Sequence, residues 1–152
     1  MEHKEAYKFL EKKTKDLGLE NLSAHIKKVG PLKITQSRMA FIPHLVKIIV
    51  GQQLSVQSAA AIWKRTEFIL KNNKYKKPNN NLNLKFKNAG LSRQKIEYIN
   101  GIIYNQDLKK FSKTKLKRLS ASDYYEMLIQ IKGIGPWSIE MSRIFFVGDP
   151  DV

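Results

Sequence analysis

The sequence contains no cysteine, and this absence excludes several kinds of chemistry. Its 152 residues cannot form a disulfide, ligate zinc or an iron–sulfur cluster through thiolates, or use a cysteine nucleophile. Histidine is scarce, and His3, His25 and His44 are too far apart for a metal-ligand motif. No apolar run approaches the roughly 20 residues of a membrane span, and the N-terminal MEHKEAYKFLEKK is too charged for a signal peptide. We expect a soluble protein without membrane contacts, cytoplasmic or, in a eukaryote, nuclear.

Acidic residues are also few. The chain has 13 Asp and Glu against 28 Lys and Arg, which gives a formal net charge of +15. Folding does not require such an excess, whereas a polyanionic partner would attract it, with nucleic acid expected first and an anionic membrane second. A Lys-, Asn- and Ile-rich composition can also follow from genome bias, so charge alone does not decide. With 42% hydrophobic residues, the chain can bury one core, in one domain or two small lobes.

Apolar residues recur at helical spacing along most of the chain, without a convincing strand pair or repeat. We expect an all-α fold, a two-lobed bundle with a helix-hairpin-helix motif, with N-terminal helices over 1–40 and the core over 41–152. The expected helices are 5–17, 22–29, 41–51, one capped by Ser55, one capped by Ser92, a short basic one within 108–119, 123–131 capped by Ser120 or Ser122, and 136–146. The Asn- and Lys-rich residues 71–87 are expected to be an irregular connection.

The stretch IQIKGIGPWSIEM, residues 129–141, places two glycines between two expected helices. Gly133 and Gly135 permit positive φ and a close backbone approach, because neither has a Cβ. Their amides and the unpaired first-turn amides of the helix beginning at Pro136 form an anion trap that suits a DNA phosphate. Ile134 is expected to anchor the turn in the core. A simple helix corner with a glycine cap is the alternative, but the apolar flanks and the charge favour binding to a DNA backbone.

A pair of glutamines, Gln52 and Gln53, lies in a tight turn between two expected helices. Amides at this place could bond to base edges or fill a gap in a base stack. The other interpretation is that both side chains satisfy backbone groups at the two helix ends. The residues alone leave both interpretations open.

Three stretches resemble the helix-hairpin-helix DNA glycosylase superfamily, most closely its 3-methyladenine DNA glycosylase branch: FIPHLVKIIVGQQLSVQSAAAIW, AGLSRQKIEYINGI and IKGIGPWSIEMSRIFFVGDPDV. They occur in the family's order and cover most of residues 41–152, while the first forty residues match only as generic helices. The resemblance implies base excision, in which a damaged base is flipped out of duplex DNA and its N-glycosidic bond is hydrolysed. A cationic alkylated purine is a good leaving group and stacks well on electron-rich rings. A duplex-DNA partner and a monomeric protein are expected.

The resemblance also implies roles for single residues. Gln53, with Leu54 beside it, matches the wedge that fills the gap left by the flipped base, and Trp137 and Met141 match pocket positions. The DNA-contacting positions that it implies are Gln52, Gln53, Leu54, Ser55, Lys132, Gly133, Ile134 and Gly135. The backbone carbonyls that match a structural Na⁺ or K⁺ site are those of Ile129, Ile131 and Ile134. No other cofactor is expected.

Trp137 bears on the type of reaction. Lyases that resemble endonuclease III have a Schiff-base lysine at this position, so tryptophan favours a monofunctional glycosylase that leaves an abasic site. The family's catalytic aspartate follows this stretch by a few residues and is expected beyond Val152, since Asp149 and Asp151 match only the lead-in to its loop.

We therefore expect a chain without its C-terminal helices, in which Leu10 and Leu17 pack incompletely. Such a chain would bind DNA and release little or no base. A complete, non-catalytic helix-hairpin-helix DNA-binding module is the alternative. RNA or membrane binding through the lysine-rich faces has weaker support, because a run of lysines is usually a solvated surface.

Overall fold

The computed structural model describes residues 3–31, 34–73 and 79–149. Every regular element within these ranges is a helix, which confirms the expected all-α class. The chain divides into two compact units, Met1–Thr35 and Gln36–Val152. The predicted domains, 1–40 and 41–152, stay a prediction.

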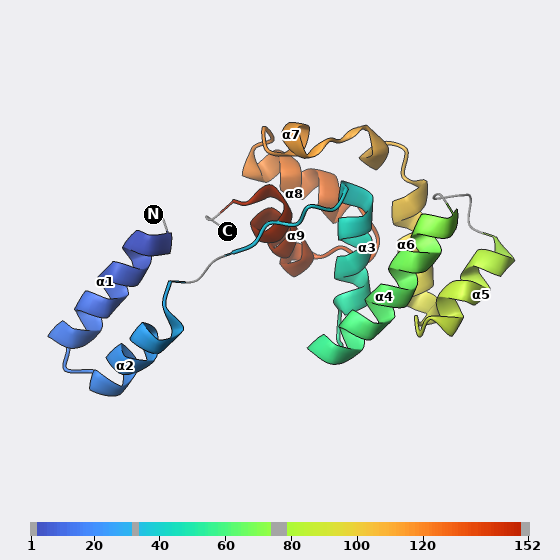
Figure 1. Ribbon diagram of the computed structural model, residues 1–152. Helices are drawn as coiled ribbons and strands as arrows, with labels where there is room; N and C mark the ends of the chain where they lie inside the picture. Colours follow the sequence, from blue (N-terminus) through green and yellow to red (C-terminus); the bar gives the residue numbers. More distant parts are fainter. Residues whose placement is uncertain (1–2, 32–33, 74–78, 150–152) are drawn as a thin grey trace. The chain divides into compact units, whose positions relative to one another are not determined.

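The first unit is a helical hairpin. Its helices α1 (His3–Asp16) and α2 (Glu20–Val29) pack against each other, and Gly18, at φ +66°, lies in the turn between them. Figure 1 draws this pair in blue. The side chains of Leu10 and Leu17 are 50% and 60% exposed, in agreement with the incomplete packing expected for them.

Helix α3 (Phe41–Gly51) is the centre of the second unit. It contacts α4 (Val56–Asn73), α6 (Arg93–Tyr104) and α9 (Pro136–Ser142), and Figure 1 shows it between α4 and α6 on one side and α8 (Ala121–Ile129) and α9 on the other. A helix that is apolar on most of its surface is expected in such a central position.

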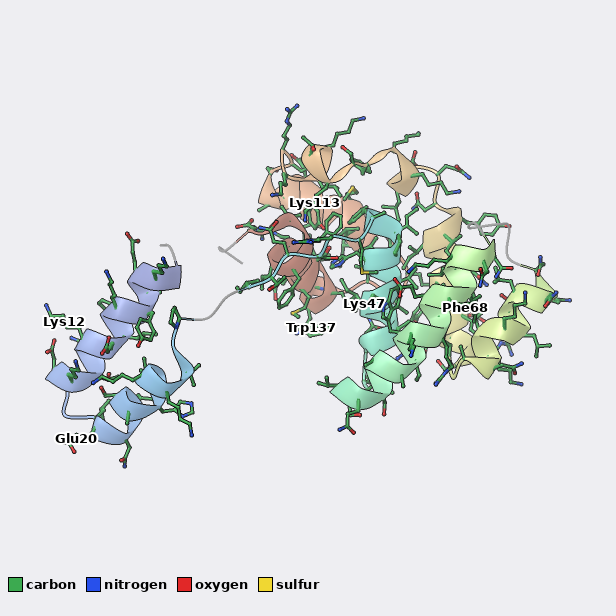
Figure 2. The ribbon with its side chains drawn as sticks, viewed as in Figure 1. Lys12, Glu20, Lys47, Phe68, Lys113 and Trp137 are labelled. Carbon is green, nitrogen blue, oxygen red and sulfur yellow. The ribbon has the colours of Figure 1, made fainter. Side chains whose placement is uncertain are left out.

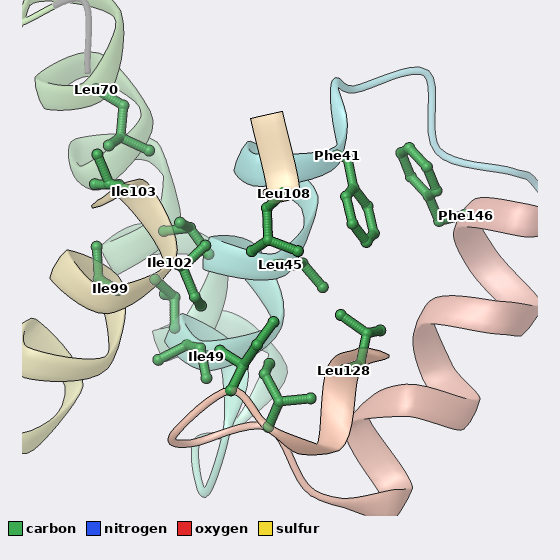
Figure 3. Close-up of a cluster of buried hydrophobic side chains, with 14 of the residues drawn as sticks. Phe41, Leu45, Ile49, Leu70, Ile99, Ile102, Ile103, Leu108, Leu128 and Phe146 are labelled. Carbon is green, nitrogen blue, oxygen red and sulfur yellow. The ribbon is translucent and has the colours of Figure 1, made fainter. Parts of the chain in front are cut away.

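The core forms around this helix. In the close-up of Figure 3, Leu45 and Ile49 of α3 lie between side chains of α6, such as Ile102, and Leu128 of α8. All four side chains are completely buried. The core therefore packs α3 between α6 and α8.

The prediction for residues 71–87 is wrong in part. Helix α4 continues to Asn73, and a further helix, α5 (Asn80–Asn88), follows. The side chain of Asn79 accepts a hydrogen bond from the Leu82 amide at 2.8 Å and so caps α5. Leu82 and Phe86, one turn apart, are buried, and this single apolar pair was hidden among asparagines and lysines. Residues 74–78 lie outside the described ranges.

Other boundaries also differ. The expected basic helix consists of a 3₁₀ helix, η1 (Leu108–Lys110), and one turn of α-helix, α7 (Lys113–Leu116), which Ser112 caps. Ser120 rather than Ser122 caps α8, accepting from the Asp123 amide at 3.0 Å. The last predicted helix becomes π-helical after Ser142, in η2 (Arg143–Val147). The predicted caps Ser55 and Ser92 are confirmed, each accepting an amide hydrogen bond at 3.3 Å.

Candidate nucleic-acid interface

The hairpin turn between α8 and α9, residues 130–135, uses its two glycines differently. Gly133 has φ +92°, in the left-handed region that favours glycine, whereas Gly135 is extended at φ −111°. Ile134 is 4% exposed, and its amide donates to the Ile131 carbonyl at 2.9 Å. This confirms that Ile134 anchors the turn. Pro136 begins α9, as predicted.

The space beside Gly133, where a side chain would lie, is filled by another residue of the protein. A Cβ at this position would lie 2.3 Å from Cδ2 of Tyr98, on α6. The hydroxyl of Tyr98 accepts a hydrogen bond from Nε2 of Gln94 at 2.6 Å. A Cβ on Gly135 would meet no atom within 4 Å. Of the two glycines, Gly135 is therefore the one whose face is open to an approaching backbone.

The side chain of Gln52 is turned toward the protein. Its Nε2 donates to the Gly133 carbonyl at 2.9 Å and to Oγ of Ser138 at 3.2 Å. The side-chain nitrogen of Gln52 thus satisfies groups of the hairpin, as in the second interpretation considered for the glutamine pair, and is engaged within the protein. Its place among the DNA-contacting residues needs this correction. The contact joins the turn after α3 to the hairpin.

Gln53 is the glutamine that the turn exposes. Its φ of 57° is the one positive value among the non-glycine residues of the described ranges. A non-glycine residue with this backbone conformation is strained by roughly 1–2 kcal/mol, and such strain recurs at functional sites. Leu54 beside it is 39% exposed, and Ser55 caps α4 rather than pointing freely outward. The turn therefore presents two side chains to solvent: the polar side chain of Gln53, whose backbone is strained, and the apolar side chain of Leu54.

The sequence reading missed Lys95. From α6, its Nζ donates to the carbonyls of Val50 and Gln52, at 2.9 and 2.6 Å. The ammonium therefore lies at the C-terminal end of α3, where the helix dipole favours a cation. Burial lowers the pKa of Lys95. The motif LSRQK signalled the cap at Ser92 but carried no sign of this contact, which joins residues more than 40 positions apart.

The two predicted pocket residues lie on α9. Trp137, in its first turn, is 60% exposed and projects from the helix in Figure 2. Met141 is half-buried and lies four residues later, so both belong to the same helix face. An exposed indole offers a flat surface for stacking, while the thioether of Met141 offers a softer apolar contact.

The carbonyls predicted to hold a cation are compatible with that role. The Ile131 carbonyl accepts the Ile134 amide, but within the described part of the chain no hydrogen bond engages the carbonyls of Ile129 and Ile134. Backbone carbonyl oxygens are the ligands of alkali cations in proteins. The hairpin therefore keeps oxygen ligands available.

The acidic residues of the described ranges form no comparable site. Asp149, the first carboxylate after α9, forms an ion pair with Arg143. Across residues 3–31, 34–73 and 79–149, no group of three or more His, Asp or Glu is arranged to bind a metal. Nor does any helix of these ranges have the length and apolarity to cross a membrane.

A groove between α4 and α5 is separate from these features. Its volume is about 750 Å³, and its lining includes Lys64, Phe68 and Lys85. Phe68 is 70% exposed and is labelled in Figure 2. None of the predicted site residues lines this groove, so we do not assign the site to it.

Comparison with known proteins gives a consistent set of relatives. No protein-family model matches the chain. DNA-3-methyladenine glycosylase 1 of Schizosaccharomyces pombe is 31% identical over 140 residues, which are 88% of this chain and 61% of that protein. The chain thus spans about three-fifths of the length of this curated relative.

Solved structures share the fold. The crystal structure of DNA-3-methyladenine glycosidase from Bacillus halodurans has a TM-score of 0.67 and 31% identity, and the match covers 84% of this chain and 59% of that one. The 3-methyladenine DNA glycosylase of S. pombe in complex with abasic DNA has a TM-score of 0.73 and 27% identity, with 87% and 67% covered. The Archaeoglobus fulgidus 3-methyladenine DNA glycosylase, 23% identical with a TM-score of 0.65 over 95% and 50% of the two chains, supports the fold alone.

Proposed function

Because the chain belongs to the helix-hairpin-helix superfamily of DNA glycosylases, in the branch of the 3-methyladenine DNA glycosylases, we propose that it acts in base excision repair. The proposed reaction is hydrolytic removal of an alkylated base, which leaves an abasic site. The observation that carries the proposal is the joining of two turns by Gln52: an exposed turn with Gln53 and Leu54, and a hairpin in which no atom lies within 4 Å of the place where a Cβ of Gly135 would be.

Duplex DNA is the proposed partner. The net charge of +15 supplies general attraction to phosphates, and the first-turn amides of α9 supply a local anion site next to the exposed Lys132. The S. pombe relative was solved with abasic DNA, which is the product of the proposed reaction. We propose that the protein binds this DNA as a monomer, in the compartment that holds the genome, cytoplasm or nucleus.

The proposed chemistry divides between binding and hydrolysis. An extrahelical alkylated purine carries positive charge, and the exposed ring of Trp137 can stack on it. Since residue 137 is not a lysine, no Schiff base forms there and water is the nucleophile. A carboxylate must stabilise the positive charge that develops on the sugar. Asp149 is engaged by Arg143, so we propose that the aspartate lies beyond Val152, as the resemblance implies.

We also propose that the hairpin holds a structural Na⁺ or K⁺ through the carbonyls of Ile129, Ile131 and Ile134. A monovalent cation supplies a positive field beside the phosphate and stiffens the turn. Its binding would be visible as a rise in melting temperature when K⁺ or Na⁺ replaces a bulky organic cation at equal ionic strength. Equal melting temperatures in these salts would contradict this part of the proposal.

Binding to two matched duplexes tests the function. We expect the 152-residue chain to bind a duplex with a central tetrahydrofuran abasic analogue more tightly than the intact duplex, by fluorescence anisotropy. Equal affinity for both would favour the alternative, a non-catalytic DNA-binding module. Release of 3-methyladenine from methylated DNA, followed by chromatography, is expected to be slow or absent with these residues. An ordinary enzymatic rate would overturn the location proposed for the aspartate.

A further inference from the structure

Helix α6 supports both turns that are proposed to contact DNA. We call residues 52–54 the wedge turn and residues 132–135 the phosphate hairpin. Lys95 and Tyr98 lie three positions apart and therefore on one face of α6. We propose that Lys95 is a positioning residue that holds the wedge turn at a fixed spacing from the phosphate hairpin, an inference that rests on the proposed function.

The contacts form a continuous connection. Lys95 donates to the backbone carbonyl of Gln52 at 2.6 Å, and the side chain of Gln52 donates to the Gly133 carbonyl at 2.9 Å. The ring of Tyr98 fills the space where a side chain on Gly133 would lie. Gln52 is thus held through its backbone by α6 and through its side chain by the phosphate hairpin. Neither turn can shift by itself without breaking one of these contacts.

The wedge turn needs such support. Helix α3 ends at Gly51, so its last carbonyls have no partner within the helix. Lys95 binds two carbonyls of this region, those of Val50 and Gln52. Directly after them Gln53 adopts φ 57°, a conformation that a non-glycine side chain keeps only when its surroundings impose it.

Lys95 makes these contacts without a carboxylate partner. None of the ion pairs of the described residues includes it. A lysine that only added charge for DNA would remain hydrated and point to solvent, as Lys109 does. Lys95 instead gives up part of its hydration to bind the C-terminal end of one helix. Its role is therefore to fix geometry.

A fixed spacing matters because one duplex must satisfy both turns. The distance between a backbone phosphate and a neighbouring base stack is set by the DNA. If the two turns moved independently, binding would have to order them first, at a cost in affinity. Intact duplex does not admit the wedge, so loss of the spacing should weaken binding to abasic DNA selectively.

The first experiment measures the coupling without DNA. Amide exchange of the full 152-residue chain is followed by NMR in the wild type, in Lys95→Met and in Lys109→Met, which removes the same charge from an exposed site. We expect Lys95→Met to speed exchange of the hydrogen-bonded amides of Gln52, in the wedge turn, and Ile134, in the phosphate hairpin, with Ile99 and Leu128 unchanged, and Lys109→Met to change neither amide. Lys95→Arg should restore slow exchange. Unchanged exchange in folded Lys95→Met would overturn the inference.

The second experiment measures the ratio of affinities for the abasic and intact duplexes. We expect Lys95→Met to lower this ratio about tenfold. Lys109→Met should weaken binding to both duplexes equally and leave the ratio unchanged. Should Lys95→Met fail to fold, Gln52→Met cuts the other half of the connection and should lower the ratio alike. An unchanged ratio in whichever variant folds overturns the inference. A wild type without abasic preference would instead overturn the proposed function, while the exchange experiment would still decide the coupling.

Discussion

The side-chain amide of Gln52 donates to the carbonyl of Gly133 at 2.9 Å, across 81 positions of sequence. The same amide reaches the hydroxyl of Ser138, which is 3% exposed. Two turns that look independent in the sequence are therefore one structural feature. Its exposed part is Gln53 with Leu54, while the half-buried Gln52 makes the connection.

The two glutamines should respond oppositely to truncation. Gln52→Ala removes the hydrogen bonds to the half-buried Gly133 carbonyl and to the buried Ser138 hydroxyl, so we expect a loss of about 1–3 kcal/mol in the free energy of unfolding. Gln53→Ala removes only exposed atoms and should change that free energy by less than about 0.5 kcal/mol. Gln53→Ala should nevertheless lower the preference for abasic over intact duplex. Urea denaturation and anisotropy measure these effects. If Gln53→Ala destabilised the protein more than Gln52→Ala, the assignment of Gln52 to the fold and of Gln53 to DNA would be contradicted.

The glycines of the hairpin should differ in the same way. Gly133→Ala places a Cβ 2.3 Å from Tyr98 and forces a left-handed backbone at φ +92°, so we expect a loss of roughly 2–4 kcal/mol in the free energy of unfolding. Gly135→Ala meets no atom within 4 Å and should be stable to within about 0.5 kcal/mol. The new methyl group should weaken DNA binding, because it lies on the open face. The double variant Gly133→Ala/Tyr98→Ala should relieve the clash but not the backbone strain.

His44 should make the folded state sensitive to acid. It is 5% exposed, its ring lies 4.8 Å from that of Phe146, and its Nε2 has no hydrogen-bond partner in the described ranges. Burial, with smaller contributions from Lys47 and Lys113, lowers the pKa of His44 from 6.5 to about 4.

The direction of the pH effect follows from that shift. The unfolded chain takes up the proton first as the pH falls, so the stability from neutral His44 is complete above about pH 6.5 and declines toward pH 4. The full decline is about 3 kcal/mol. His44→Leu should remove this part of the pH dependence. Urea denaturation at pH 7.5 and 4.5 measures it, and parallel pH profiles for the two proteins would contradict the prediction.

Trp137 should matter for binding a base and not for folding. Its side chain is 60% exposed, so Trp137→Ala should change the free energy of unfolding by less than about 0.5 kcal/mol. A stacked base contributes about 1–3 kcal/mol, so affinity for a duplex with 3-methyl-3-deazaadenine, a lesion analogue resistant to hydrolysis, should fall by about tenfold or more. Trp137→Phe keeps a stacking ring and should lose less. Equal losses for both variants would argue against stacking.

Local patterns in the sequence were sufficient for most elements of the fold. Apolar residues at helical spacing predicted the central helix over 41–51, and serines before such runs predicted the caps at Ser55 and Ser92. The wrong elements have local causes too. Helix α5 buries only Leu82 and Phe86. Two apolar residues are too few to stand out within an asparagine-rich segment.

The sequence by itself determined the helices, the basic charge, the buried Ile134 and the tryptophan at position 137, because each depends on a residue and its near neighbours. The tertiary structure alone decided which glutamine faces solvent, which glycine is covered, and that Lys95 binds the end of α3. These contacts join residues about 35 to 86 positions apart, and no periodicity records which side chain meets which carbonyl. The same residue types could serve either DNA or the fold, and packing assigns them.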